Sequence, residues 1–200
     1  MLQMRLGRRQ IQRSHRNLRK SQCFTQNLHL RQQQFVIDRQ PTSLKNSPIV
    51  KTLVWPDEAA TAAYATQLAV ALTRVKLNAC IALHGDLGAG KTTLVRHVLQ
   101  ALGVQGRIKS PTYAVVEPYT TAAGEIWHFD FYRFSDPREW EDAGFRDLFA
   151  SPGLKLCEWP QNAAGVMPGP DLELDIQVDE AEQRYVHITA LTPRGQELLA

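Results

Sequence analysis

Apolar residues follow two different periods along residues 51–200. A spacing of three and four positions predicts one helix over residues 56–73 and another over residues 92–102. Strict alternation of apolar and polar residues predicts strands over 172–178 and 186–190, with a polar turn between them. These two strands are expected to form a C-terminal β-hairpin with one solvated face.

Short apolar runs between these elements predict further strands. They cover residues 51–55, 78–83, 114–119, 126–130 and 154–158. The third and fourth runs surround a short polar connection, which predicts an antiparallel hairpin inside or beside the sheet. Short helices are expected over residues 138–143 and 145–149. Because 44% of the 200 residues are hydrophobic, the chain can build one core of good size, and we predict an α/β fold with a mixed sheet flanked by helices.

The first 50 residues differ from the rest in composition. They carry ten lysine and arginine side chains against one acid, Asp38, and their single apolar cluster is Phe35-Val36-Ile37. Such a segment buries too little surface to offset the entropy of ordering, so we expect a disordered basic extension over 1–50 before a domain over 51–200. Three interpretations of the extension stay open: a misplaced start codon, an organellar transit peptide, or an arm that contacts RNA phosphates.

Cysteine usage and hydropathy exclude several classes of protein. The 3 cysteines form no Cys-x-x-Cys pair, so neither a disulfide scaffold nor a four-ligand zinc site is expected from them. No run approaches the roughly 18 apolar residues of a membrane span, so we expect a soluble, cytoplasmic protein without membrane association. Histidines other than His128 show no metal-ligand spacing.

One motif carries specific chemistry. The segment Gly85-Asp86-Leu87-Gly88-Ala89-Gly90-Lys91-Thr92 matches G-x-x-x-x-G-K-[S/T] between a predicted strand and a predicted helix, the context that a phosphate-binding P-loop requires. Its glycines let N–H groups converge on phosphate oxygens, and the helix N-terminus adds a positive dipole end. We expect Lys91 at the β- and γ-phosphates and the Thr92 hydroxyl on Mg²⁺. The alternative is a purely structural, glycine-rich helix entry.

Two predicted strands end in acids. Asp130 closes the run 126–130, and Glu158 closes the run 154–158. Beside a P-loop, Asp130 is the first candidate for the Walker-B-like carboxylate, and Glu158 is a second candidate for binding Mg²⁺ or orienting the attacking water. The alternative for each acid is a solvated strand end.

Polar residues near these acids add to the candidate site. The segment Ser110-Pro111-Thr112-Tyr113 follows the P-loop helix and is placed to act as a γ-phosphate switch, or it is an ordinary turn. His128 lies two residues before Asp130 and is expected on the same strand face. Arg133 is expected to pair with an acid or a phosphate.

In order and spacing, these motifs resemble the TsaE family, also called YjeE. The P-loop, Ser110–Tyr113, His128–Arg133 and Glu158-Trp159-Pro160 carry the resemblance, which covers about residues 52–195. It implies a compact bacterial ATPase that binds ATP and Mg²⁺, hydrolyses ATP slowly and serves threonylcarbamoyladenosine modification of tRNA. It also implies the TsaD and TsaB proteins as partners, with tRNA reached indirectly through their complex.

The resemblance also implies roles for particular residues. Lys91, Asp130 and Glu158 would serve catalysis, and Thr92, Asp130 and Glu158 would hold the metal. Thr61 on the first helix would lie near the nucleotide, and Arg184 near its base or ribose. The residues expected to bind the nucleotide are Thr61, Gly85, Asp86, Leu87, Gly88, Ala89, Gly90, Lys91, Thr92, Thr93, Ser110, Thr112 and Arg184.

Two rival functions share parts of this pattern. A small-molecule or nucleoside kinase has the same loop and sheet, but its lid normally supplies several arginines to the transferred phosphoryl group. Between residues 118 and 168 the chain offers only Arg133, Arg138 and Arg146, which do not cluster. A GTPase is disfavoured because no Asn-Lys-x-Asp loop is present. The rival outside the enzymes is a non-catalytic, nucleotide-dependent binding switch.

Overall fold

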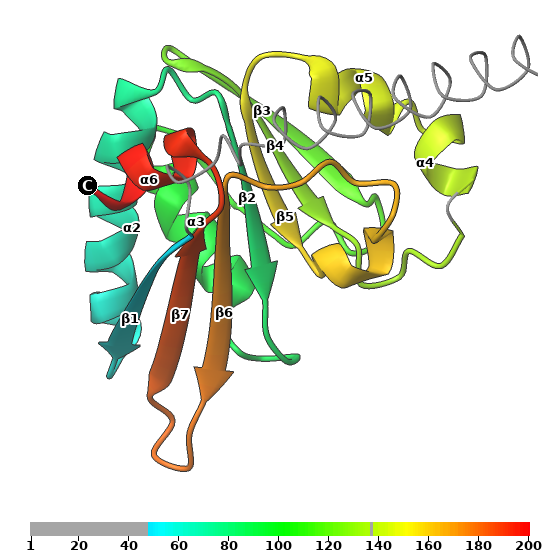
Figure 1. The fold of residues 1–200 in the computed structure, drawn as a ribbon. Coiled ribbons are helices and arrows are strands. Elements are labelled where there is room, and N and C mark those ends of the chain that lie inside the picture. Colours follow the sequence, from blue (N-terminus) through cyan, green and yellow to red (C-terminus); the bar gives the residue numbers. More distant parts are fainter. Residues whose placement is uncertain (1–47, 137) are drawn as a thin grey trace, which may run out of the picture. The chain divides into compact units, whose positions relative to one another are not determined.

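The computed structural model describes residues 48–136 and 138–200 (Figure 1). The predicted extension over 1–50 therefore lies almost wholly outside the described residues. The described part forms one seven-stranded sheet in the order β1-β7-β6-β2-β5-β4-β3. Its strands are β1 (Ile49–Trp55), β2 (Ala79–His84), β3 (Val116–Thr121), β4 (Gly124–Asp130), β5 (Leu154–Glu158), β6 (Leu172–Val178) and β7 (Arg184–Ala190).

The sheet is mixed, as predicted. Strands β2, β4, β5 and β6 are parallel to one another, whereas β3 and β7 pair antiparallel with their neighbours. Both predicted hairpins are confirmed: β3 pairs with β4, and β6 pairs with β7. Strand β1 adds to the edge of the second hairpin through β7. The alternation in β6 buries Leu172, Leu174 and Ile176, but Val178 is exposed at the strand end.

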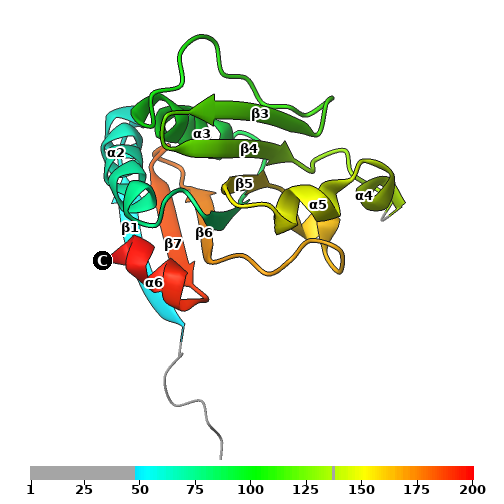
Figure 2. The same cartoon turned by 90° about the horizontal axis from the view of Figure 1, so that it is seen from above.

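Helices cover both faces of the sheet (Figures 1 and 2). They are α2 (Glu58–Arg74), α3 (Lys91–Ala101), α4 (Arg138–Asp142), α5 (Phe145–Ala150) and α6 (Pro193–Leu199), with a 3₁₀ turn, η1, at Pro160–Ala163. Asp57 caps α2, because its carboxylate accepts a hydrogen bond from the Ala60 N–H at 2.8 Å. The sequence pattern did not predict α6 or η1.

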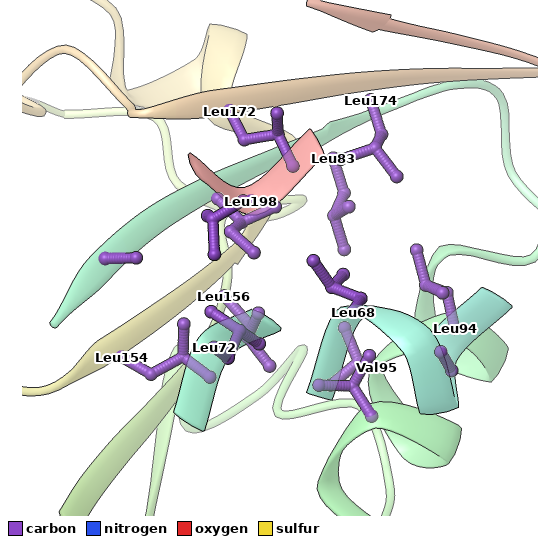
Figure 3. Packing of buried hydrophobic residues seen from close by; sticks show 14 of the residues in the cluster. Leu68, Leu72, Leu83, Leu94, Val95, Leu154, Leu156, Leu172, Leu174 and Leu198 are labelled. Atoms are coloured by element: carbon purple, nitrogen blue, oxygen red, sulfur yellow. The ribbon is translucent and has the colours of Figure 1, made fainter. Parts of the chain in front are cut away.

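The two faces of the sheet have different cores. Aliphatic side chains from the strands, α2, α3 and α6 fill one face, and Leu72 and Leu83 are at most 1% exposed there (Figure 3). Aromatic side chains fill the other face beneath α4 and α5, where Phe129 stacks on Phe131 with ring centres 5.5 Å apart. Truncating one of the buried leucines to alanine costs about 2–5 kcal/mol, so either core holds its helices firmly.

Sheet topology brings the candidate residues to one edge. Strand β2 leads into the P-loop, and α3 begins at Lys91. Strands β4 and β5 are parallel to β2, so their final residues, Asp130 and Glu158, lie at the same edge and are direct partners in the strand register. The carboxyl ends of parallel strands are where α/β proteins place their ligands.

Candidate functional site

The P-loop backbone is shaped by glycines. Gly85 has φ +130°, and a Cβ there would lie 2.3 Å from the Ile176 carbonyl oxygen, so no other residue fits without moving β6. Gly90 has φ +107° and precedes α3 without a capping side chain. The first N–H groups of α3 therefore have no side-chain acceptor, which is the arrangement that suits a phosphate.

Lys91 lies over the P-loop itself. Its Nζ donates hydrogen bonds to the carbonyl oxygens of Gly85 at 2.6 Å and Asp86 at 2.8 Å. It also lies 3.9 Å from the ring centre of Trp159, a cation–π contact. Burial lowers the pKa of Lys91, and the nearby carboxylate of Glu158 opposes that shift most strongly. The ammonium is thus held at the loop without an ion-pair partner in direct contact.

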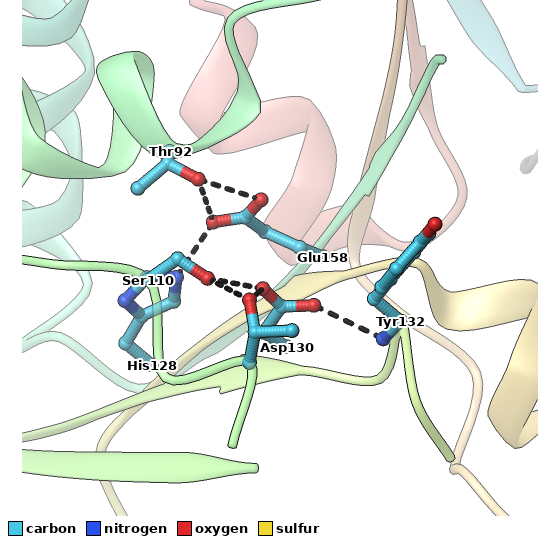
Figure 4. A network of polar contacts seen from close by, with 7 residues as sticks. Thr92, Ser110, His128, Asp130, Tyr132 and Glu158 are labelled. Carbon is cyan, nitrogen blue, oxygen red and sulfur yellow. Dashed lines mark hydrogen bonds and ion pairs between the residues drawn. The ribbon is translucent and has the colours of Figure 1, made fainter. Parts of the chain in front are cut away.

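Thr92 and Glu158 are hydrogen-bonded to each other. The Thr92 hydroxyl donates to the Glu158 carboxylate, 2.8 Å from Oε1 and 2.9 Å from Oε2 (Figure 4). On its other side, Oε1 lies 2.8 Å from Nε2 of His128. Glu158 is only 2% exposed. The second of the two strand-end acids is therefore the one that reaches the P-loop threonine.

Asp130 has a different set of partners. Its Oδ2 accepts hydrogen bonds from the hydroxyls of Ser110 and Thr112, the latter at 2.7 Å, and its Oδ1 accepts from the Tyr132 N–H at 3.0 Å (Figure 4). The segment that contains Ser110 is thereby tied to the end of β4. Asp130 is 3% exposed, so it is no solvated strand end.

These residues line one cleft of about 300 Å³. The predicted residues that line it are Leu87, Gly88, Gly90, Lys91, Thr92, Thr93, Ser110, Thr112, Asp130 and Glu158. Gly85 and Asp86 contribute the carbonyls that hold Lys91. Ala89 lines a second hollow instead. Thr92 and Glu158, which are 66 positions apart in the sequence, thus meet in one place.

The second hollow lies against the same P-loop. It measures about 170 Å³ and is lined by Trp55, Glu58, Thr61, Ala89, Gly90, Thr93 and Arg184. Gly90 and Thr93 line both hollows, which joins Thr61 and Arg184 to the loop. The Thr61 hydroxyl is 3.4 Å from the Asp57 carbonyl oxygen, and Arg184 donates to the Glu182 carbonyl at 2.6 Å. Both residues thus lie against the P-loop, as predicted from the sequence resemblance only for a nucleotide-bound state.

Some contacts at the site were not predicted from the sequence, and one prediction is met only by a different partner in the structure. Trp159 stacks on Lys91 and has φ +57°, an unusual backbone conformation whose only sequence signal is its place after a strand-end acid. Within residues 48–136 and 138–200, Arg133 forms no ion pair with an acid, and the alternative partner, a phosphate, stays a prediction. The Arg133 guanidinium lies 4.3 Å from the ring centre of Tyr113 and donates to the Tyr113 hydroxyl at 3.3 Å. The contact between His128 and Glu158 was not foreseen either.

The donor set fits Mg²⁺ bound together with a nucleotide. The Thr92 hydroxyl and the carboxylates of Glu158 and Asp130 provide oxygen atoms, which Mg²⁺ prefers. Within residues 48–136 and 138–200, no three His, Cys, Asp or Glu side chains are grouped as a metal site. A site with few protein ligands is usual where phosphates complete the coordination of Mg²⁺.

Fold and loop together define a P-loop type of α/β protein. Residues 55–186 match the family model described as Threonylcarbamoyl adenosine biosynthesis protein TsaE. The chain belongs to the TsaE family, which takes part in the biosynthesis of threonylcarbamoyladenosine in tRNA. The resemblance seen in the motifs is therefore confirmed.

Individual relatives agree with this assignment. The chain is 39% identical to the tRNA threonylcarbamoyladenosine biosynthesis protein TsaE of Haemophilus influenzae over 147 residues, covering 72% of this chain and 92% of that protein. The protein of the same name from Bacillus subtilis is 32% identical over 118 residues, which cover 59% of this chain and 73% of that one. The crystal structure of Bacillus subtilis YdiB superposes with a TM-score of 0.60 at 24% identity, covering 78% and 95%, and supports the fold.

Within the described residues, no helix is both long enough and apolar enough to cross a membrane.

Proposed function

We propose that this protein binds ATP with Mg²⁺, hydrolyses it slowly, and does so as a component of a TsaD–TsaB assembly in tRNA modification. One observation carries the proposal: Lys91 and Thr92 of a P-loop face the same cleft as two buried strand-end carboxylates. Phosphate, metal and water can all be held by groups of that kind. Family membership supports the pathway, and the site chemistry supports the nucleotide.

In this proposal the P-loop side of the cleft binds the phosphates and the metal. Phosphate oxygens would take the place of the Gly85 and Asp86 carbonyls that now accept from Lys91. Thr92 and Glu158 would hold Mg²⁺, which supplies positive charge to the β- and γ-phosphates when bound. Because these groups already line one cleft, nucleotide binding would exchange their hydrogen-bond partners without having to bring them together.

The Asp130 side of the cleft would respond to the γ-phosphate. Ser110 and Thr112 are tied to Asp130 by their hydroxyls, which are donors that a phosphate oxygen could also accept from. An exchange of acceptors would move the segment that carries Tyr113, whose side chain is 85% exposed. The segment could then signal the nucleotide state to a partner.

A partner would also complete the charge in the cleft. Among the described residues that line it, Lys91 is the one cation. A group supplied in trans can raise phosphoryl-transfer rates by about 10³–10⁵. Leu87 and Tyr132, which line the cleft and are 77% and 44% exposed, offer apolar contacts for such a partner at its mouth.

The test is ATP turnover by the purified chain with and without TsaD and TsaB. We expect slow release of ADP from the chain alone, acceleration by the two partners together, and co-elution with them that requires ATP and Mg²⁺. Thr92→Val should lose the acceleration while remaining folded, because valine matches threonine in shape but offers no hydroxyl to the metal. Transfer of phosphate to an added nucleoside would favour the kinase, and nucleotide binding without any turnover would favour the binding switch.

A further inference from the structure

His128 is a fully buried side chain with one polar contact. It lies on β4 opposite β5, and its Nε2 is 2.8 Å from Oε1 of Glu158. Its other ring nitrogen, Nδ1, is buried and has no hydrogen-bond partner among the described residues. The Glu158 carboxylate is therefore the one polar group among the described residues with which the His128 ring interacts.

The unpartnered nitrogen indicates where the proton lies. A proton on Nδ1 would be a buried donor without an acceptor, and the Nε2 lone pair would then face a carboxylate oxygen. A proton on Nε2 instead gives a hydrogen bond from His128 to Glu158 and leaves only a lone pair unpaired. The same carboxylate accepts from the Thr92 hydroxyl, which is consistent with an acceptor on both sides.

We infer that His128 is the positioning residue of the metal site: its Nε2–H holds the Glu158 carboxylate in line with Thr92 and the cleft. This inference rests on the proposed function, because it gives Glu158 the task of binding Mg²⁺. Thr92 and Glu158 would both turn to the metal, so the bond between them cannot fix Glu158 in the loaded state. His128 reaches Glu158 from the opposite side and keeps its bond. Removing such an outer partner of a metal ligand typically costs 10–100-fold in metal affinity.

The first test determines which ring nitrogen of His128 carries the proton in the nucleotide-free protein. Nitrogen-15 NMR of labelled full-length protein distinguishes protonated from unprotonated ring nitrogens. We expect the His128 signals to show a proton on Nε2 and none on Nδ1, and Glu158→Gln to shift the Nε2 signal most. A proton on Nδ1 with a bare Nε2 would overturn the inference, whatever the nucleotide does.

The second test compares two amides of different reach. The side-chain nitrogen of glutamine can replace Nε2 of histidine, whereas the nitrogen of the shorter asparagine corresponds to Nδ1 and does not reach Glu158. Titration calorimetry with ADP, in Mg²⁺ and then in EDTA, gives the factor by which Mg²⁺ tightens ADP binding. We expect His128→Asn to reduce this factor about tenfold and His128→Gln to retain most of it. ADP affinity in EDTA should be alike in the parent and both variants.

The outcomes separate this inference from the proposed function. If the parent binds ADP more tightly with Mg²⁺ and both variants do so equally, His128 does not position the metal ligand and the inference fails alone. If the parent binds no ADP, or binds it without any effect of Mg²⁺, the proposed function fails and takes the inference with it. Equal loss in the glutamine and asparagine variants, with lowered melting temperatures, would assign His128 a packing role instead.

Discussion

Lys91 and Lys155 are buried in the same manner in two unlike parts of the molecule. They are 4% and 3% exposed. The Lys91 ammonium lies 3.9 Å from the ring centre of Trp159. The Lys155 ammonium lies 4.8 Å from that of Trp127. Each donates to two carbonyls of a nearby loop, those of Gly85 and Asp86 for Lys91 and those of Ser151 and Gly153 for Lys155.

The difference lies in the charges around the two lysines. Burial lowers the pKa of both. Around Lys91 three carboxylates oppose the shift, and around Lys155 the opposing groups are two thiols. These neighbours are Glu158, Asp130 and Asp86 for Lys91, and Cys80 and Cys157 for Lys155. Carbonyls and an indole suffice to bury an ammonium, so these features alone do not mark a binding site. The acids of the adjoining cleft are what distinguishes Lys91 from Lys155.

The largest effect is expected from exchanging each lysine for methionine. Lys91→Met should abolish detectable ATP hydrolysis and greatly reduce the melting shift caused by ATP and Mg²⁺, because it removes the cation that would face the phosphates in the proposed function. Lys155→Met should leave hydrolysis unchanged, since Lys155 does not line the cleft. Turnover assays and thermal melts with and without nucleotide measure both.

Both variants are expected to lose stability, because Lys91 and Lys155 each donate to two loop carbonyls. Lys155→Met leaves the Ser151 and Gly153 carbonyls without their donor and should lower the free energy of unfolding by about 1–3 kcal/mol. Equal ATP-induced melting shifts in the parent and in Lys91→Met would contradict the P-loop assignment. A loss of hydrolysis in a stably folded Lys155→Met would show that the two lysines do not divide in this way.

Gly153, whose carbonyl accepts a hydrogen bond from Lys155, provides the next prediction. Gly153 has φ +137°, and a Cβ there would lie 2.4 Å from the Trp127 ring. Gly153→Ala should therefore lower the free energy of unfolding by more than about 2 kcal/mol in urea titrations, through backbone strain and a clash with Trp127. Gly165→Ala is the matched control, since Gly165 has φ +86° and open space around its Cβ position. A similar loss of unfolding free energy in both variants would mean that backbone strain, and not the clash with Trp127, accounts for the effect of Gly153→Ala.

These comparisons also show what the sequence could predict. The P-loop and the acids at the ends of β4 and β5 follow from local patterns, because strand ends and glycine turns are encoded by neighbouring residues. The sheet order and the pairing of Asp130 with Glu158 depend on contacts between residues far apart, which no single pattern specifies. The stacking of Trp159 on Lys91 depends on that register as well.

Helix α6 illustrates a second limit of the sequence reasoning. It spans only seven residues and contains Gly195, so its helical pattern is weak, although Pro193 stands at the first helical position, where proline is favoured. Thr192 caps it by accepting from the Gly195 N–H at 3.1 Å. A Cβ on Gly195 would lie 1.9 Å from the carbonyl oxygen of Asp171, which directly precedes β6. The close approach of α6 to the start of β6 therefore requires glycine at position 195. Tertiary packing thus adds to the local Thr192–Pro193 start signal in stabilising this short helix.

The smallest expected effect is a difference in how stability depends on pH. A lysine whose pKa is lowered by folding binds fewer protons in the folded state than in the unfolded state, so its contribution to the free energy of unfolding rises with pH. For Lys155 the rise should be confined to the window between its lowered pKa and the ordinary value of 10.5.

Three other groups among the described residues titrate in the alkaline range and act in the opposite direction. Burial raises the pKa of the Tyr64 and Tyr119 phenols and of the Cys157 thiol, so each removes stability as pH increases through its ordinary value. The lysine effect must therefore be measured as a difference between parent and variant. In urea titrations from about pH 7 to about pH 10, the parent should gain stability relative to Lys155→Met.

The corresponding difference between the parent and Lys91→Met should rise less steeply. The three carboxylates around Lys91 favour its charged form and offset part of the burial effect, whereas Lys155 has only thiols to oppose burial and the cation of Arg194 to reinforce it. Equal slopes of the two stability differences against pH would mean that the carboxylates of the cleft do not act on Lys91. The two lysines would then differ only in the carbonyls that accept their hydrogen bonds. A steeper rise for Lys155 would identify the field of the cleft acids as the property that separates a phosphate-binding lysine from a structural one.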